Sequence, residues 1–350
     1  MSKLNYWSLF VCFFLPLVLA FCGPAQAQTA TITALTGQSC VAERAGGSRS
    51  CVSNDFATIL SFDQPAATAL ANCRAGSVVS VDVLAEVTSG SAQRYDIGLF
   101  VGEEGQVPAD AATGSTCSLG LFPTSPNPFL ALDFDTCGDF QLSSTAILEV
   151  QSVNVLCTPA AGTNLLSVPY TLVFNNRADG NTCTASNITA GTNAKCIKSS
   201  AATLTGVEVN GYVTITKQTD PDGDAASFDF AASSSATVTP ASASLGDGGS
   251  QTFLVPLSGT GSRTLTITEA ALAGWDSTAS ISCTDPSGGN ATYVTVSNAT
   301  RTIEASLDAI NYGAVCTITN SKIQNADLVT VKTLASGDAT PAEGDTVTYL

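Results

Sequence analysis

Histidine is absent from this chain of 350 residues, and its only methionine is Met1. Without histidine, neither a Ser-His-Asp nor a Cys-His catalytic arrangement can form, and no imidazole is available to a metal. Basic residues are scarce: 13 Lys and Arg stand against 29 Asp and Glu, giving a net charge of −16. Nucleic-acid binding needs a basic face for the phosphates, and no stretch of the sequence gathers one. We therefore expect no nucleic-acid partner.

Two further patterns are missing. None of the twelve cysteines stands in a CxxC pair, so zinc ribbons and thioredoxin-like redox sites find no support. Only two tryptophans are present, and Trp7 lies in the N-terminal leader. Asp133 and Asp135 have the paired carboxylates of a glycosidase, but no aromatic platform for a sugar accompanies them. We expect a protein that is not an enzyme.

The first 27 residues have the order of a secretory signal peptide. Lys3 supplies the positive charge, an apolar run extends over 4–22, and Ala25-Gln26-Ala27 provides a cleavage site. An uncleaved anchor and a lipoprotein acylated at Cys22 are the alternatives, the latter disfavoured by the bulk of Phe21. No later stretch is long and apolar enough to span a bilayer. The sequence predicts a secreted or cell-surface protein with no membrane span in its mature part.

Ten cysteines remain after the leader, and an even number outside the cytosol indicates disulfides. Eight of them lie between residues 40 and 196, where many connectivities are open. Pairing between sequence neighbours is our interpretation, and Cys283 and Cys316 form the only pair available further along. The expected pairs are Cys40–Cys51, Cys117–Cys137, Cys183–Cys196, Cys73–Cys157 and Cys283–Cys316.

Short alternating apolar runs bounded by Gly, Asn, Asp and Ser predict an all-β chain of tandem β-sandwich domains. A disulfide-rich N-terminal domain is expected over 28–207, with strands at 78–84, 95–101, 146–150 and 170–174. A second sandwich of about seven strands is expected over 208–323, with strands at 212–217, 228–230, 251–257, 263–269, 281–283 and 314–320. Residues 324–350 begin a third unit with strands at 327–333 and 344–350. Since one or two strands cannot bury a sheet face, we expect the natural protein to continue beyond this point.

The second domain resembles a known family. Its opening strand reads VTITKQTDPDG over 213–223, LTITE over 265–269 precedes Ala273-Gly274-Trp275, and CTITN over 316–320 closes the unit. These motifs resemble the SpaA-like prealbumin-fold domain, which is related to the collagen-adhesin B-type repeat of bacterial surface proteins. Leu272 departs from the family, which usually has proline there. Residues 326–350 are similar to the start of the bacterial conserved-repeat domain, the domain of unknown function numbered eleven.

The resemblance implies a candidate internal isopeptide bond between Lys217 and Asn320, assisted by Glu269. Alternation supports the three positions, because each follows an apolar residue two places earlier on the same strand face. Burial would favour a neutral amine and a protonated carboxyl, which the reaction needs. The alternative is a lysine at a strand end that reaches solvent or pairs with Glu269.

Two acidic clusters are weak calcium candidates, and calcium is the only cofactor we consider. Alternating carboxylates in loops are suited to this ion, although solvated turns are the alternative in both clusters. The second cluster is expected to lie near Cys137 and Asp96. The clusters consist of Asp220, Asp222 and Asp224, and of Asp133, Asp135 and Asp139.

The sequence thus predicts a non-enzymatic structural or adhesion protein of the bacterial surface, whose stalk-like domains present the N-terminal domain. The alternative is that the N-terminal domain is itself a binding module for a glycan, a matrix protein or calcium. The surface or matrix ligand is not identified by any motif.

Overall fold

The computed structural model describes residues 29–41, 51–53, 56–90, 93–102, 116–141, 145–178, 183–188, 194–199, 202–323, 334–336, 340, 342–344, 346 and 348–349. The prediction of an all-β chain with tandem sandwiches is confirmed. The expected signal peptide over 1–27 lies outside the described residues. Within the described ranges, we find no helix with the length and apolar character needed to cross a bilayer.

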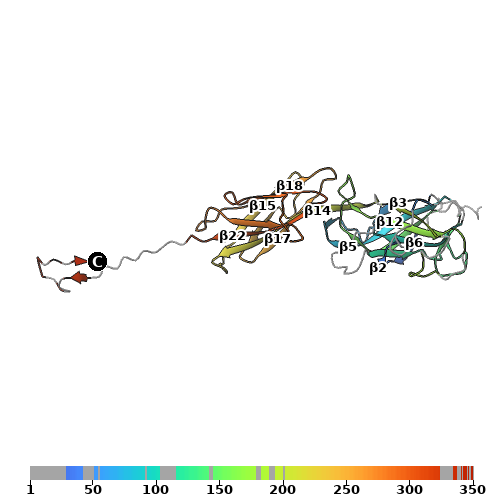
Figure 1. Cartoon of the computed structure of the whole chain (residues 1–350), viewed down its shortest axis with the longest axis horizontal. Coiled ribbons are helices and arrows are strands. Elements are labelled where there is room, and N and C mark those ends of the chain that lie inside the picture. Colours follow the sequence, from blue (N-terminus) through green and yellow to red (C-terminus); the bar gives the residue numbers. More distant parts are fainter. Residues whose placement is uncertain are drawn as a thin grey trace, which may run out of the picture.

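The N-terminal domain is a sandwich of two sheets (Figure 1). Valines and alanines on alternate positions of the first sheet point inward, as the burial of Val81, Val83 and Val87 shows. The first sheet has the order β1 (Thr29–Thr33), β10 (Thr145–Leu156), β5 (Val78–Ser89), β3 (Phe56–Asp63). The facing sheet has the order β13 (Ala194–Ser199), β12 (Tyr170–Asn175), β6 (Tyr95–Val101), β7 (Thr116–Leu121), β2 (Leu35–Ser39). The four strands expected here lie within β5, β6, β10 and β12.

The second domain is also a sandwich, and its core holds Phe228, Phe230 and Phe253. Three short strands were not expected from the sequence. They are β16 (Ser242–Leu245), β20 (Val294–Ser297) and β21 (Thr302–Leu307). One sheet has the order β17 (Ser250–Pro256), β14 (Thr203–Asp220), β22 (Gly313–Ser321), β19 (Ser280–Thr284). The other has the order β16 (Ser242–Leu245), β15 (Phe228–Ser234), β18 (Arg263–Glu269), β21 (Thr302–Leu307), β20 (Val294–Ser297).

Strand β14 belongs to both domains, and the border expected between residues 207 and 208 falls inside it. Its first part pairs with β4 (Asn72–Arg74) and β11 (Leu165–Ser167), and its second part pairs with β17 and β22. At the junction, the amide of Ala75 donates to the carbonyl of Asn210 at 2.8 Å. The guanidinium of Arg74 stacks 4.4 Å from the ring centre of Tyr212. A paired strand, visible in Figure 1, thus connects the two sandwiches.

Beyond the second domain, β23 (Leu334–Ser336) and β24 (Thr348–Tyr349) form an antiparallel pair. The strand expected at 327–333 lies outside the described residues. The likeness of this segment to the conserved-repeat domain stays a prediction.

A tight loop of the N-terminal domain depends on Gly138. The loop joins β8 (Phe129–Leu130) to β9 (Asp139–Phe140). The amide of Gly138 donates to the carbonyl of Phe122 at 2.8 Å, and a methyl group at Gly138 would lie 2.1 Å from the Pro123 carbonyl oxygen. Because that contact is to backbone, no side chain can move aside to relieve it. The glycine therefore allows the loop to pack directly on the chain that follows β7.

We expect Gly138→Ala to destabilise the N-terminal domain by about 1–3 kcal/mol, the usual cost of overpacking. The matched control is Gly246→Ala, whose added methyl would meet its nearest atom at an ordinary 3.6 Å. Urea unfolding followed by circular dichroism measures both. Equal midpoints for the two variants would contradict the role given to Gly138.

Candidate functional site

Five disulfides join the ten cysteines from Cys40 to Cys316. The structure pairs Cys73 with Cys157 and Cys283 with Cys316, as expected. The other three expected pairs are wrong. The structure instead forms Cys40–Cys117, Cys51–Cys196 and Cys137–Cys183.

The physical reason for the different pairing is sheet topology. Cys40 follows β2, and β2 pairs with β7, where Gln38 lies opposite Cys117. A sandwich brings strands together that are distant along the chain, so the nearest cysteine in sequence is not the nearest in space. The sequence carries no local signal for this pairing.

The three isopeptide candidates lie buried inside the second sandwich. Their exposed fractions are 0 % for Lys217, 1 % for Glu269 and 2 % for Asn320. Lys217 on β14 and Asn320 on β22 belong to one sheet, in which these two strands are parallel neighbours. Glu269 comes from β18 in the facing sheet. The alternation of the three strands places all three side chains inward, and full burial excludes a lysine that reaches solvent.

Glu269 bridges the other two side chains. Its Oε1 lies 3.8 Å from Lys217 Nζ, and its Oε2 accepts a hydrogen bond of 2.9 Å from Asn320 Nδ2. Lys217 Nζ also donates to the carbonyl of Ile318 at 3.3 Å and to that of Gln218. These bonds hold the amine beside β22, two residues before Asn320.

Apolar surroundings set the charge of this group. The ring of Phe228 lies 4.1 Å from Lys217 Nζ. Burial lowers the pKa of Lys217, and the charge of Glu269 opposes that shift. Burial raises the pKa of Glu269, while the hydrogen bond from Asn320 and the charge of Lys217 act to lower it. Burial thus favours the neutral amine and the protonated acid.

Sequence reasoning gave no role to Arg301. Its Nε lies 4.0 Å from Glu269 Oε2 and donates to the Glu269 carbonyl at 3.4 Å. A signal was present, because only three basic residues occur between 208 and 320, and Arg301 is one of them. Arg301 provides a positive charge at the edge of the site and holds the end of β18.

The acidic loop after β14 does not gather its carboxylates. Asp224 forms an ion pair of 2.7 Å with Lys322, and the hydrogen bond from Lys322 lowers the pKa of Asp224. Asp247 accepts the amides of Thr219 and Gly223 at 2.6 and 2.9 Å. Among the residues described, Asp220, Asp222 and Asp224 do not bring ligand atoms together as a metal group.

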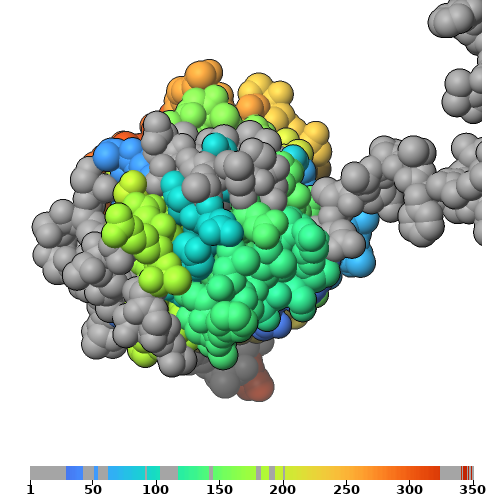
Figure 2. All heavy atoms as spheres, turned by 90° about the vertical axis from the view of Figure 1, so that its right-hand side faces the viewer, coloured from blue at the N-terminus to red at the C-terminus, as the bar shows by residue number. Residues whose placement is uncertain are grey.

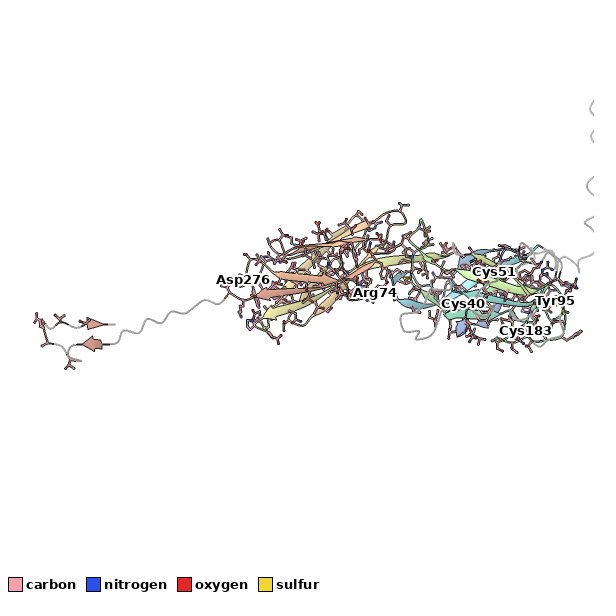
Figure 3. The ribbon with its side chains drawn as sticks, in the orientation of Figure 1. Cys40, Cys51, Arg74, Tyr95, Cys183 and Asp276 are labelled. Atoms are coloured by element: carbon pink, nitrogen blue, oxygen red, sulfur yellow. A yellow bond between two sulfur atoms is a disulfide. The ribbon has the colours of Figure 1, made fainter. Side chains whose placement is uncertain are left out.

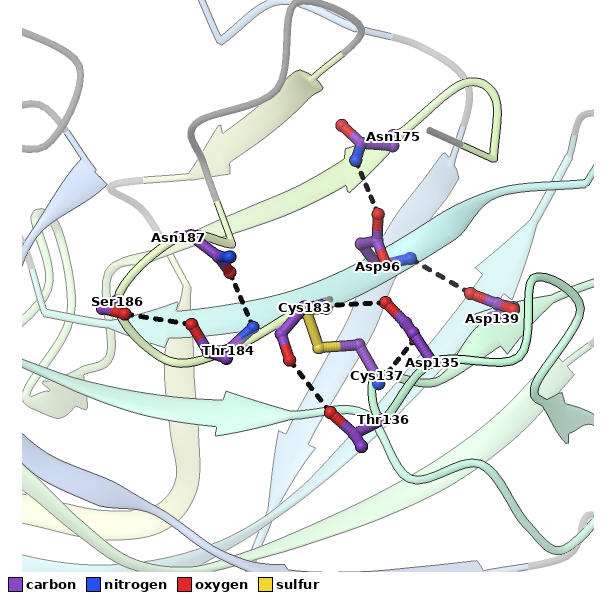
Figure 4. The surroundings of a disulfide bond; sticks show 10 residues. All are labelled: Asp96, Asp135, Thr136, Cys137, Asp139, Asn175, Cys183, Thr184, Ser186 and Asn187. Atoms are coloured by element: carbon purple, nitrogen blue, oxygen red, sulfur yellow. Dashed lines mark hydrogen bonds between the residues drawn. A yellow bond between two sulfur atoms is a disulfide. The ribbon is translucent and has the colours of Figure 1, made fainter. Parts of the chain in front are cut away.

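The second acidic cluster does come together, with a different membership. Figure 4 shows two of its members, Asp96 and Asp135, with the neighbouring Asp139. Carboxylate oxygens of Asp96, Asp133 and Asp135 all lie within 4.8 Å of one another. Asp139 accepts the backbone amides of Asp96, at 3.1 Å, and of Leu132. Asp139 therefore holds the start of β6 against the loop. The sequence predicted a cluster of Asp133, Asp135 and Asp139, and in the structure Asp96 takes the place of Asp139.

Mass spectrometry of an unreduced digest tests the disulfide pairing. We expect fragments that contain Cys51 and Cys196 joined to each other, because Ser53 donates its amide to the Cys196 carbonyl and holds these segments together. Fragments that join Cys40 to Cys51 would contradict the structure. The Cys283–Cys316 fragment serves as the internal control, because both connectivities contain it.

Comparison with solved structures gives remote likenesses. One similar structure is a bacterial adhesin from Mobiluncus mulieris, which is described as containing intramolecular disulfide, isopeptide and ester bond cross-links. It is 12% identical in sequence, its TM-score is 0.27, and the match covers 73% of this chain and 96% of the adhesin chain. The T-13 major pilin protein of Streptococcus pyogenes is 12% identical with a TM-score of 0.24, over 71% and 100%. BcpA, the major pilin subunit of Bacillus cereus, is 11% identical with a TM-score of 0.23, over 73% and 68%. We base no functional conclusion on likenesses of this size.

No curated protein matches the chain. Residues 213–322 match the family model of the SpaA_4 prealbumin-like fold domain. The matched residues run from the middle of β14 to the residue after β22, and they contain Lys217, Glu269 and Asn320. Residues 213–322 therefore have a prealbumin-like fold.

Proposed function

We propose that this chain is a non-enzymatic structural element of the bacterial cell surface, in which the prealbumin-like domain is a stalk unit closed by a covalent bond between Lys217 and Asn320. The observation that carries the proposal is the fully buried group formed by Lys217, Glu269 and Asn320. A fully buried lysine is costly in its charged form even beside one carboxyl, and a reaction that converts its amine into an amide removes that cost. The leader pattern and the five disulfides support export.

The reaction joins an amine to a carboxamide. The neutral amine of Lys217 attacks Asn320 Cγ, a new Nζ–Cγ amide bond forms, and the Cγ–Nδ2 bond breaks. The proton lost from Nζ leaves with Nδ2, and one molecule of ammonia is released. Glu269 touches both partners, so its carboxyl can donate a hydrogen bond to Asn320 Oδ1 and carry the proton to the leaving nitrogen.

Glu269 can donate a hydrogen bond to Asn320 Oδ1 once the side-chain amide of Asn320 is turned by about 180°. Asn320 Nδ2 faces Glu269 Oε2, and exchange of the amide oxygen and nitrogen would turn Oδ1 toward the same carboxyl. A protonated Glu269 then polarises the carbonyl that Lys217 attacks. The raised pKa of Glu269 supports this protonation state.

The position of the bond suits a stalk. Lys217 lies on the strand that arrives from the N-terminal domain, and Asn320 lies on the strand that leaves the second domain. A bond between neighbouring first and last strands would let tension pass through the domain without unfolding the chain between them. Stalks of this kind would hold the N-terminal domain away from the cell.

Intact mass measurement tests the bond. We expect the mature chain to weigh one ammonia less than its sequence with five disulfides, because the reaction expels Asn320 Nδ2. Lys217→Met removes the nucleophile and Glu269→Gln removes the acid, so both variants keep the full mass. The control is Glu304→Gln, which changes an exposed side chain on β21 and keeps the deficit. A full mass for the unsubstituted chain would contradict the proposal.

Stretching single molecules between the chain ends tests the mechanical consequence. The bond would keep the segment 217–320 from extending, and Lys217→Met leaves that segment open. Because Cys283–Cys316 still closes 33 positions of it, the variant releases about 70 more residues than the unsubstituted chain. At about 3.3–3.6 Å per residue this adds roughly 240 Å of contour length. Glu304→Gln should behave as the unsubstituted chain does. Equal extension of the Lys217→Met variant and the unsubstituted chain would contradict the proposal.

A further inference from the structure

An acidic group lies at the end of the N-terminal domain that faces away from the second domain. Figure 3 places Tyr95 and Cys183 at this end, and Figure 2 looks onto it, where segments distant in the sequence lie side by side. The group draws on β6, on the loop 131–138 and on the segment after Cys183. Its members are Asp96, Asp133 and Asp135, whose carboxylate oxygens lie within 4.8 Å of one another.

Asp96 is the innermost of the three and is 4 % exposed. Its Oδ2 accepts a hydrogen bond of 2.6 Å from Asn175 Nδ2. Within the described part of the chain, no donor reaches its buried Oδ1. A buried anionic oxygen without a donor is costly, and negative neighbours increase the cost.

Asp135 fixes the loop and still has oxygen lone pairs to offer. Its Oδ1 accepts the amide of Cys137 at 2.9 Å, and its Oδ2 accepts the amide of Cys183 at 3.0 Å. Each carboxylate oxygen can accept a second interaction. Asp135 is thus held toward Asp96 by backbone bonds on both sides of the Cys137–Cys183 disulfide (Figure 4).

We propose that Asp96, Asp133 and Asp135 bind one calcium ion. The ion would lie among the three converging carboxylate oxygens and would supply a positive charge next to the buried Asp96 Oδ1.

The chemistry of the ligands selects calcium. All three offer carboxylate oxygens, the ligands that calcium prefers at about 2.3–2.6 Å, so opposite ligands stand about 5 Å apart. The three ligand oxygens lie within 4.8 Å of one another, which is no farther apart than opposite ligands of one calcium ion. The nearby sulfurs of Cys137 and Cys183 are joined to each other, and so they offer no thiolate to a softer metal.

A bound ion would tie three separate segments together. It would connect the start of β6 to the loop 131–138, and Asp135 already bonds that loop to Cys183. Asp139 is not one of the proposed ligands. Its carboxylate accepts a hydrogen bond from the backbone amide of Asp96 and so helps to position Asp96. The end of the domain would then be ordered by an ion in addition to the disulfide.

Isothermal titration of the chelator-treated full chain with calcium chloride tests the proposal. We expect one site with a dissociation constant on the order of 10⁻⁴–10⁻³ M or tighter, the range of extracellular calcium modules. Asp96→Asn and Asp133→Asn each weaken binding by at least about tenfold, because each removes a charged ligand. The matched control is Asp276→Asn, which changes an exposed aspartate at the end of the second domain that faces away from the N-terminal domain and which binds as the unsubstituted chain does (Figure 3).

Circular dichroism and the melting temperature in chelator show whether each variant is folded. Asp133 is half-buried in a loop, so its variant keeps the test decisive if Asp96→Asn does not fold. Absence of calcium binding by the unsubstituted chain would overturn the proposal and assign the group to carboxyls that share protons. Binding that persists unchanged in a folded Asp133→Asn variant would overturn it as well.

Discussion

Backbone pairing along β14 is the constraint on which the rest of the molecule depends. This strand runs over Thr203–Asp220 and is bonded to strands of both sandwiches. Its amides and carbonyls would otherwise need water at the junction, and the ladder satisfies them within the protein. The same ladder fixes where Lys217 faces, since the register with β22 sets Lys217 opposite Ile318. Junction and candidate cross-link are therefore parts of one hydrogen-bonded element.

The buried group around Lys217 and the acidic group around Asp96 both place charged side chains in a nonpolar interior, and the charges have opposite sign. In the second domain, a buried amine lies beside one carboxyl and a phenylalanine ring. In the N-terminal domain, the carboxylates of Asp96, Asp133 and Asp135 converge, and Asp96 is buried. A low-dielectric interior penalises both arrangements unless charge is removed or neutralised. We propose loss of ammonia in the first case and a cation in the second.

Much of the second domain could be predicted from sequence, because its signals are local. Alternation placed Lys217, Glu269 and Asn320 on inward faces, and apolar runs marked β14, β18 and β22. The strands β16, β20 and β21 were missed, since they are short and rich in serine and threonine. Three of the disulfide pairs predicted for the N-terminal domain were wrong, because the spacing of cysteines along the sequence does not reveal which strands are neighbours in a sheet. The sequence placed Asp96 near the second acidic cluster, but only the position of β6 beside the loop shows that Asp96 takes the place of Asp139 in that group.

The parallel arrangement of β14 and β22 has a consequence for how the second domain meets a pulling force. Nine residue pairs, from Tyr212 opposite Gly313 to Asp220 opposite Ser321, join the two strands. Force enters β14 at its amino end and leaves β22 at its carboxyl end, and these ends lie at opposite extremes of the paired segment. The strands are thus loaded in shear, so the hydrogen bonds between them share the load and do not open one after another like a zipper. Even before any covalent bond forms, the topology resists extension along the axis of the chain.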